Sequence, residues 1–317
     1  MLTSPPSGYE SLREGAAWFD LSNRGRIAAR GEDRARLLHA MSTNQVEALK
    51  PGEGCYAFFL TAQGRITSDA NVLCLADQIL IDTEPETADS LTAHIGKHII
   101  ADDVTLEDVR GTTCVIAIEG PRAAEALAAL GAPVPQAAFA HCPWADRVVA
   151  ALSATGQPGY RIFAPTTGKA ALIAQVESAG ATAASSEAVH IVRLENGRPR
   201  YGEDISMANL AQETQLDTAL SFNKGCYLGQ EIVERVRSRG HVNRLLVRLA
   251  IERSDPPAPG AAILSGAATA GAITSAAFSP ALGRAFALGY VRPDLASKGT
   301  LLDVDGCRAE VIASRPD

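Results

Sequence analysis

The chain has 317 residues, of which 46% are hydrophobic and 21% charged, so it can bury a substantial core and is long enough for two or three domains. Its formal net charge of −7 argues against nucleic acid as a direct partner, because neutralising phosphates needs a strongly positive surface. The start of the chain has no basic segment leading into an apolar one, and no apolar run approaches the roughly 20 residues that span a bilayer, which predicts a cytoplasmic protein with no membrane partner.

The first predicted elements form a repeated unit. Residues 25–43 begin with a strand pattern that ends at Gly31 and continue with a helix whose apolar positions recur at three-residue steps. Residues 113–130 show the same strand, a glycine at position 120 and an alanine- and leucine-rich helix. Aligned without gaps, the two segments are a weak internal repeat.

The repeat extends through both halves of the chain. Each first helix is followed by strand-like runs and a second helical stretch. A closing strand is expected over VTLEDV (104–109) in the first half and over AVHIVRLENG (188–197) in the second. This order is the split βαβ pattern of ferredoxin-like units, so we predict two α+β units over most of residues 20–200.

From Asn243 onward, short strand-like runs are separated by turns rich in proline and glycine, with no helical pattern between them. Such spacing predicts a small antiparallel barrel or sandwich. We therefore expect three domains, over residues 1–112, 113–240 and 241–317. The first ~24 residues are free to pack on the second unit instead of the first.

Several common reaction motifs are absent from the sequence. It contains no G-x-x-x-x-G-K-[ST] phosphate loop, no G-x-G-x-x-G after a strand, no G-x-S-x-G and no H-E-x-x-H. The nearest metal-like spacing, His94 and His98, lacks a third ligand, so we expect no metal site. The six cysteines contain no C-x-x-C pair, which fits neither a disulfide framework nor a self-contained cluster site.

The stretch RLENGRPRYGEDI (193–205) is unusual for a simple connection. Glu195 follows the predicted strand, and Gly197 and Gly202 allow close approach of the backbone. A carboxylate at the end of a strand beside a glycine can accept hydrogen bonds from a planar heterocycle with N–H donors. The alternative is an exposed loop acid.

The stretch NKGCYLGQE (223–231) is the second unusual segment. Two glycines bracket Cys226, and QEIVERVRSR (230–239) predicts a helix directly afterwards. Cys226 thus precedes a helix N-terminus and follows Lys224 by two positions, and both influences favour thiolate over thiol. The alternative is a small apolar side chain packed under the helix.

These segments resemble a known family. KGCYLGQE (224–231) resembles the signature of the YgfZ family of folate-binding proteins, which includes mitochondrial factors that help to assemble four-iron four-sulfur clusters. The wider chain resembles the glycine-cleavage T-protein (GcvT) superfamily. WFDLSNRGRIAARGEDRARLLHAMSTN (18–44) is similar to its opening pattern, LTAQGRITSDANVL (60–73) to its glycine hairpin, and residues 193–205 to its R-L-E-x-G-x-x-x-Y-G-x-D stretch.

The resemblance implies two ferredoxin-like domains and a C-terminal antiparallel β-barrel arranged as a ring, with tetrahydrofolate or a derivative in a central cavity. By motif it implies that Glu195 meets the pterin ring and that Asp69 lies near the reactive nitrogens of the folate. The other cofactor-binding residues it implies are Tyr201, Lys224 and Tyr227. Cys226, Lys224 and Asp69 are the implied catalytic residues, and Lys224, Cys226 and Tyr227 are expected to face the cavity.

Two departures separate this chain from aminomethyltransferases of the superfamily. Those proteins commonly carry two acids at the hairpin, where this chain has Ser68 and then Asp69, and an acid where it has Cys226. Losing carboxylates removes the simplest stabilisation of a positively charged aminomethyl intermediate, which makes amine transfer to folate the weaker expectation.

The first expectation is therefore a folate-binding accessory protein, rather than a classical enzyme, for assembly or repair of iron–sulfur clusters in enzymes such as tRNA-modifying radical enzymes. Its partners would be those enzymes or cluster-assembly proteins, with Cys226 as a transient ligand. The alternative is a tetrahydrofolate-dependent aminomethyltransferase or demethylase. A third possibility is a ring that has lost folate and binds partner proteins alone.

Overall fold

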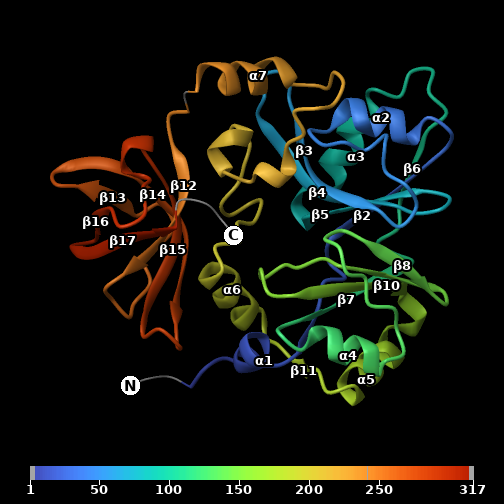
Figure 1. The fold of residues 1–317 in the computed structure, drawn as a ribbon, viewed down its shortest axis with the longest axis horizontal. Helices are drawn as coiled ribbons and strands as arrows, with labels where there is room; N and C mark the ends of the chain where they lie inside the picture. Colours follow the sequence, from blue (N-terminus) through green and yellow to red (C-terminus); the bar gives the residue numbers. More distant parts are fainter. Residues whose placement is uncertain (1–3, 241, 314–317) are drawn as a thin grey trace.

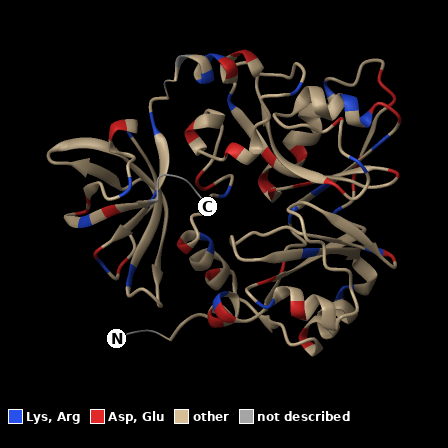
Figure 2. Cartoon of the chain, in the orientation of Figure 1, with Lys and Arg blue, Asp and Glu red and all other residues tan. Residues whose placement is uncertain are grey.

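The computed structural model describes residues 4–240 and 242–313 of the chain. Over these residues the chain forms a five-stranded sheet, a six-stranded sheet and a closed barrel of six strands, arranged around a centre that holds helix α6, Ser186–Glu195 (Figure 1). This architecture confirms the predicted α+β class with a C-terminal antiparallel barrel. Acidic and basic residues are interspersed over all three units (Figure 2). None of the helices in the described residues is long and apolar enough to cross a membrane.

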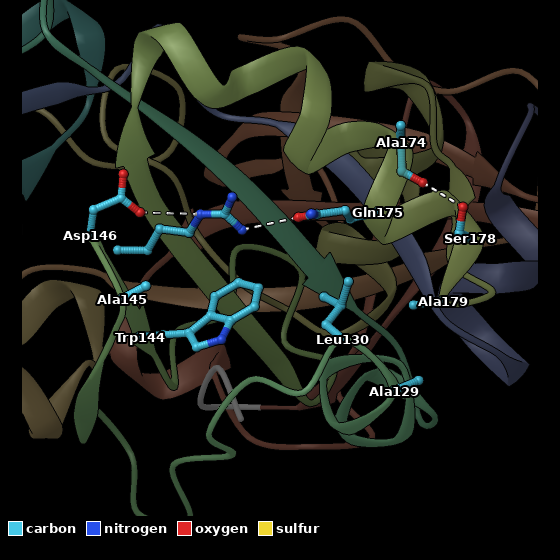
Figure 3. Close-up of a pocket in the computed structure, with 10 residues that line it drawn as sticks. Ala129, Leu130, Trp144, Ala145, Asp146, Ala174, Gln175, Ser178 and Ala179 are labelled. Carbon is cyan, nitrogen blue, oxygen red and sulfur yellow. Dashed lines mark hydrogen bonds and ion pairs between the residues drawn. The ribbon is translucent and has the colours of Figure 1, made fainter.

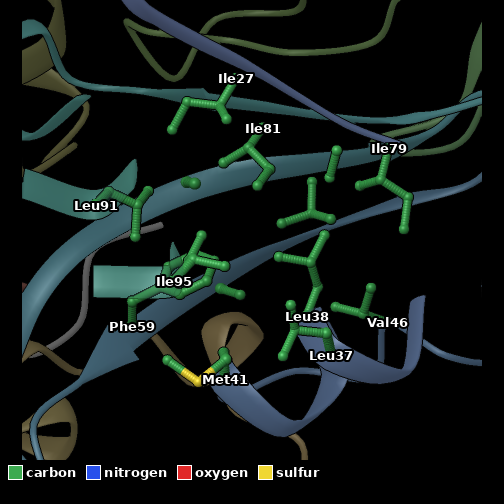
Figure 4. Packing of buried hydrophobic residues seen from close by; sticks show 14 of the residues in the cluster. Ile27, Leu37, Leu38, Met41, Val46, Phe59, Ile79, Ile81, Leu91 and Ile95 are labelled. Atoms are coloured by element: carbon green, nitrogen blue, oxygen red, sulfur yellow. The ribbon is translucent and has the colours of Figure 1, made fainter. Parts of the chain in front are cut away.

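The first domain is built on a sheet with the strand order β3-β4-β5-β2-β6. Its strands are β2 (Gly25–Arg30), β3 (Gly54–Leu60), β4 (Ile66–Cys74), β5 (Ile79–Thr83) and β6 (Thr105–Asp108), and its helices are α2 (Arg34–Met41) and α3 (Ala88–Gly96). Leu37, Leu38 and Leu91 of these helices pack against Ile27 and Ile81 of the sheet (Figure 4). Because side chains alternate along a strand, the intervening positions form a second face that neither α2 nor α3 covers, called the helix-free face below.

The helix-free face of this sheet carries polar side chains in register. Tyr56 of β3 lies opposite Asn71 of β4, and Asn71 lies opposite Asp82 of β5. Asp69 lies two positions before Asn71 on the same strand and therefore shares this face. The alternation thus gathers a phenol, an amide and two carboxylates on the side of the sheet opposite α2 and α3.

The second domain repeats this topology. Its strands are β1 (Ala17–Asp20), β7 (Thr113–Glu119), β8 (His141–Trp144), β9 (Arg147–Ala150), β10 (Gly159–Pro165) and β11 (Thr182–Ala183), and its helices are α4 (Ala123–Ala129) and α5 (Lys169–Ser178). The order β8-β9-β10-β7-β1-β11 matches that of the first sheet, with β1 inserted before the last strand. The N-terminal strand therefore pairs within the second sheet, antiparallel to β7 and parallel to β11.

The expected closing strand over residues 188–197 was wrong, because this segment is helix α6. Ser185 caps the helix by accepting a hydrogen bond from the backbone N–H of Ala188 at 3.2 Å. The buried Ala188, Ile191 and Val192 recur at helical spacing and pack with residues of the barrel. The sheet closes instead with the short β11.

The two sheets meet through their helix-free faces. Leu73 and Leu80 of the first sheet pack with Val115 and Phe163 of the second. Arg161, two residues before Phe163 on β10, forms an ion pair with Asp82 across the same interface. The interface between the two sheets thus contains an apolar cluster and, beside it, a buried ion pair.

The barrel has the order β12-β15-β14-β13-β16-β17. Its strands are β12 (Leu245–Ile251), β13 (Ala262–Ser265), β14 (Ala268–Ser279), β15 (Arg284–Val291), β16 (Leu301–Val304) and β17 (Cys307–Ala313). A tight turn at Asp305 and Gly306, both with positive φ, separates β16 from β17. Helix α7 (Gln230–Arg239) precedes the barrel, and α1 (Tyr9–Glu14) contacts α6.

Candidate functional site

A cavity of about 740 Å³ lies where the two sheets and α6 meet. Its wall is formed by β1 and the loop that follows, the helix-free face of the first sheet, residues 153 and 154, one side of α6, and the loop over residues 198–203. This volume lies in the usual range for small-molecule sites. Of the site residues that we expected from the sequence, only Asp69 lines this cavity in the part of the chain that the structure describes.

Asp69 presents an unsatisfied acceptor in this wall. The residue is 5% exposed, and its Oδ2 accepts a hydrogen bond from the Tyr56 hydroxyl at 2.7 Å. Its Oδ1 is buried without a hydrogen-bond partner in the described part of the chain. Burial, reinforced by the negative charge of Glu84, raises the pKa of Asp69 to about 6. A buried acceptor without a partner is suited to a donor supplied by a ligand.

Ser68, one of the two departures noted in the sequence, lies on the opposite side of β4. Its hydroxyl is fully buried among the hydroxyls of Thr83 and Thr87, at 2.9 and 3.0 Å. Strand alternation directs this position away from Asp69. An acid at position 68 would therefore point into the hydroxyl cluster, so Ser68 does not remove a charge from the cavity.

A network of buried ion pairs holds the wall beside Asp69. Asp82 is fully buried, with Oδ1 accepting from Arg24 Nε at 2.9 Å and Oδ2 from Asn71 Nδ2 at 2.9 Å, and it also pairs with Arg161. Burial alone would raise the pKa of Asp82, but Arg24 and Arg161 outweigh it and keep the pKa below its usual value. Glu84 joins this network through Arg24.

Glu195 does not line the cavity. It lies on the side of α6 that faces α1 and the barrel, where it is 8% exposed, and it accepts hydrogen bonds from the Tyr9 hydroxyl and from Ser279 Oγ at 2.5 Å. Arg13 adds a longer contact of 3.5 Å. In this structure helix α6 turns the carboxylate toward these partners, and the expected contact with a heterocycle stays a prediction.

Tyr201 also lies outside the cavity wall. It is buried in the cluster that covers the β3–β4 hairpin, and its hydroxyl donates to the carbonyl of Ile66 at 3.2 Å. Burial raises the pKa of Tyr201 to about 12, so the hydroxyl stays protonated as a donor. Its contacts in this structure stabilise the hairpin that carries Asp69.

Lys224, Cys226 and Tyr227 form a separate region and are not among the residues that line this cavity. Lys224 Nζ donates to the carbonyls of His39, Ser42 and Asn44 at 2.5, 2.6 and 2.9 Å, which ties it to the C-terminal end of α2. It also lies over the Tyr227 ring at 4.8 Å.

Burial and charge contacts set the character of this second region. Burial lowers the pKa of Lys224 to about 8 and raises that of Tyr227 to about 12. Cys226 is exposed, just before α7. The lysine is thus a structural cap, whereas the thiol is open to a partner.

A second hollow, of about 620 Å³, lies on the second domain between α4, the β8–β9 turn and α5 (Figure 3). Alanine side chains form much of its lining, and Arg147 lies over the Trp144 ring at 4.7 Å. Arg147 also contacts Gln175 at 3.1 Å and Asp146 at 3.7 Å. Because its charged groups pair with each other, this hollow is the weaker candidate for a reaction site.

Comparisons with known proteins agree with this architecture. Residues 7–224 match the GCVT N-terminal domain, and residues 244–315 match the glycine cleavage T-protein C-terminal barrel domain. The chain is 28% identical to the "Putative transferase At1g60990, chloroplastic" of Arabidopsis thaliana, covering 95% of this chain and 72% of that protein. It is 28% identical to the "Aminomethyltransferase" of Rubrobacter xylanophilus, covering 90% and 78%.

A solved structure is also similar in fold. The glycine cleavage system aminomethyltransferase T from Bartonella henselae superposes with a TM-score of 0.88 at 23% identity, covering 96% of this chain and 87% of that one. The match covers nearly the whole chain, so the two proteins share this fold.

Proposed function

The chain belongs to the glycine-cleavage T-protein family, and from this premise we propose that it is a folate-dependent one-carbon transferase that binds a reduced folate in the central cavity. The observation that carries the proposal is the free Oδ1 of Asp69, a buried acceptor in a cavity of about 740 Å³. Relatives named aminomethyltransferase support this reaction class over the accessory role favoured from the sequence. The placement of Ser68 supports it further, because no cavity charge is lost there.

The residues of the wall fit a reduced folate, which would supply ring N–H donors and nitrogens that accept a one-carbon unit. Oδ1 of Asp69 would accept one of these N–H groups. With a pKa of about 6, the carboxylate is charged at neutral pH and can take up a proton during transfer. Tyr56 holds Oδ2 in place, and the Arg24–Asp82 pair fixes the neighbouring strand. The same negative charge would stabilise a cationic aminomethyl group.

Binding and turnover of the purified protein test this proposal. We expect calorimetry to show one saturable site for tetrahydrofolate per chain, and we expect an aminomethyl donor to yield 5,10-methylene-tetrahydrofolate, with release of ammonia and of the group that carried the aminomethyl unit. Binding without product from any donor would favour an accessory role. Absence of binding would overturn the proposal and favour a ring that contacts partner proteins alone.

The accessory role for iron–sulfur enzymes remains a second candidate because of Cys226. Its sulfur is exposed outside the cavity, so a partner can reach it without displacing a ligand there. The exposed Phe222, which stacks under Arg237 at 4.2 Å, lies four residues before it in the sequence. A transient ligand to a partner's cluster needs this kind of access.

We expect Cys226→Ala to leave the thermal midpoint and folate affinity of the purified protein unchanged, because the sulfur is exposed and remote from the cavity wall. The accessory candidate predicts that this variant fails to restore cluster-dependent activities, such as tRNA thiomethylation, in a deletion strain. Cys307→Ala, in the barrel, is the matched control. Full rescue by Cys226→Ala would remove the thiol from the function.

A further inference from the structure

Arg198 differs from the other arginines in the cavity wall. Each of those pairs with at least one carboxylate: Arg24 with Asp82 and Glu84, Arg161 with Asp82, Arg193 with Glu203 and Asp204, and Arg200 with Glu84, Glu86 and Glu203. The guanidinium of Arg198 has no hydrogen bond or ion pair in the described residues, although it is partly buried. Such a cation in a cavity is costly unless an anion joins it.

The backbone holds Arg198 in a fixed position. Its N–H donates to the carbonyl of Arg193 at 2.7 Å, and its own carbonyl accepts from Arg193 Nη1 at 3.0 Å. Pro199 follows and restricts the chain further. Nδ2 of Asn196 donates to the carbonyl of Thr155 at 2.9 Å, which anchors the start of the same loop to the second domain. The position is therefore prepared before any ligand arrives.

A glycine makes room for the side chain. A Cβ on Gly156 would come within 3.0 Å of Cγ of Arg198, and Gly156 has a φ of +86°. The stem of Arg198 thus lies against a turn that only a residue without a side chain accommodates easily. This contact directs the arginine along the wall of the cavity that it lines.

The charge of Arg198 acts near the acceptor end of the cavity. Burial and the neighbouring Asp69 raise the pKa of the Tyr56 hydroxyl well above its ordinary value, and the positive charge of Arg198 opposes this rise. Tyr56 is the residue that holds the Asp69 carboxylate. An acceptor for N–H groups and an unpaired cation therefore line the same cavity.

We propose that Arg198 binds a carboxylate of the cavity's occupant, a proposal that rests on the proposed folate site and deepens it. The occupant then offers N–H donors to Asp69 and a carboxylate to Arg198. Two sources supply this carboxylate: the glutamyl tail of the folate itself, or a small amino acid bound in the same cavity. A guanidinium suits either, because its parallel N–H groups match the two oxygens of a carboxylate.

The first test compares 5-formyltetrahydrofolate with 5-formyltetrahydropteroate, which lacks the glutamyl tail, by calorimetry. If the tail is the source, the wild type binds the folate about 10- to 100-fold more tightly than the pteroate. This factor corresponds to the usual free energy of a charge-assisted hydrogen bond. Arg198→Met removes this preference, whereas Arg198→Lys keeps part of it. Arg122→Met, on the outer surface of the second domain, is the control and should match the wild type.

The second test adds sarcosine or glycine to the protein, free or saturated with the pteroate. If the amino acid is the source, the wild type binds both pterins with equal affinity. It also binds the amino acid with a measurable heat, and Arg198→Met loses this heat. If Arg198→Met changes neither comparison while circular dichroism shows an intact fold, the carboxylate site is overturned and the folate proposal stands. If the wild type binds no folate, the proposed function fails, and the carboxylate site survives only if amino acid binding depends on Arg198.

Discussion

Asp69→Asn is expected to reduce kcat/KM for one-carbon transfer about 100- to 1000-fold, the usual effect of losing a charged group at the reacting centre. The amide keeps the size of the side chain and can still accept from the Tyr56 hydroxyl, but it carries no negative charge and takes up no proton. Steady-state kinetics at saturating folate would measure the loss. A variant with wild-type turnover would exclude Asp69 from the reaction.

The same substitution has a second readout that does not depend on a donor substrate. Because the folded-state pKa of Asp69 is raised to about 6, the fold favours the protonated form, and the wild type loses stability as pH rises from the ordinary value toward and through 6. The full cost above that pH is about 3 kcal/mol. We expect Asp69→Asn to be more stable than the wild type at pH 8 and to lose this advantage near pH 4.

Denaturant unfolding across this pH range measures the difference. Tyr56→Phe is the matched control, because it keeps the ring but removes the hydroxyl that lowers the pKa of Asp69. The pH at which the stability difference between the wild type and Asp69→Asn reaches its full size should therefore move upward in a Tyr56→Phe background, whereas its onset, set by the unfolded-state pKa, should stay in place. A stability difference that does not vary with pH would show that Asp69 is not the titrating group.

Periodicity in the sequence predicted most of the fold because consecutive residues form each repeated unit, so its strands and helices show in the local pattern. The strand, glycine and helix over residues 25–43 and 113–130 became β2–α2 and β7–α4 at the expected places. The strand predicted over residues 188–197 was wrong because valine and isoleucine occur in strands as well as in helices. The packing of Ile191 against the barrel favours the helix and depends on tertiary structure. The Ser185 cap is instead a local signal that could have been recognised in the sequence.

The candidate site was predicted less completely because its wall is assembled from distant segments. Asp69 was expected at the site and lies in the cavity wall, and strand alternation in β3 and β4 would also have pointed to Tyr56 and Asn71. The pairing of Arg161 with Asp82 joins residues 79 positions apart across two sheets, and no local pattern predicts it. The motif around Lys224 combines a partly buried cation that binds backbone carbonyls with an exposed thiol. The sequence alone does not show which of the two side chains is exposed.

Asp82→Asn is expected to give the largest loss of stability, about 3 to 5 kcal/mol, because it leaves Arg24 and Arg161 buried without one of their charged partners. The pKa of Asp82 is lowered in the fold, so its contribution is present above its ordinary pKa and is lost as pH falls through the folded-state value. The wild-type and variant curves should therefore converge in acid. Asp77→Asn, on the same hairpin and 72% exposed, removes a surface pair with Arg30 and should cost less than about 1 kcal/mol. Equal losses for the two variants at pH 7 would mean that the buried network does not hold the two sheets together.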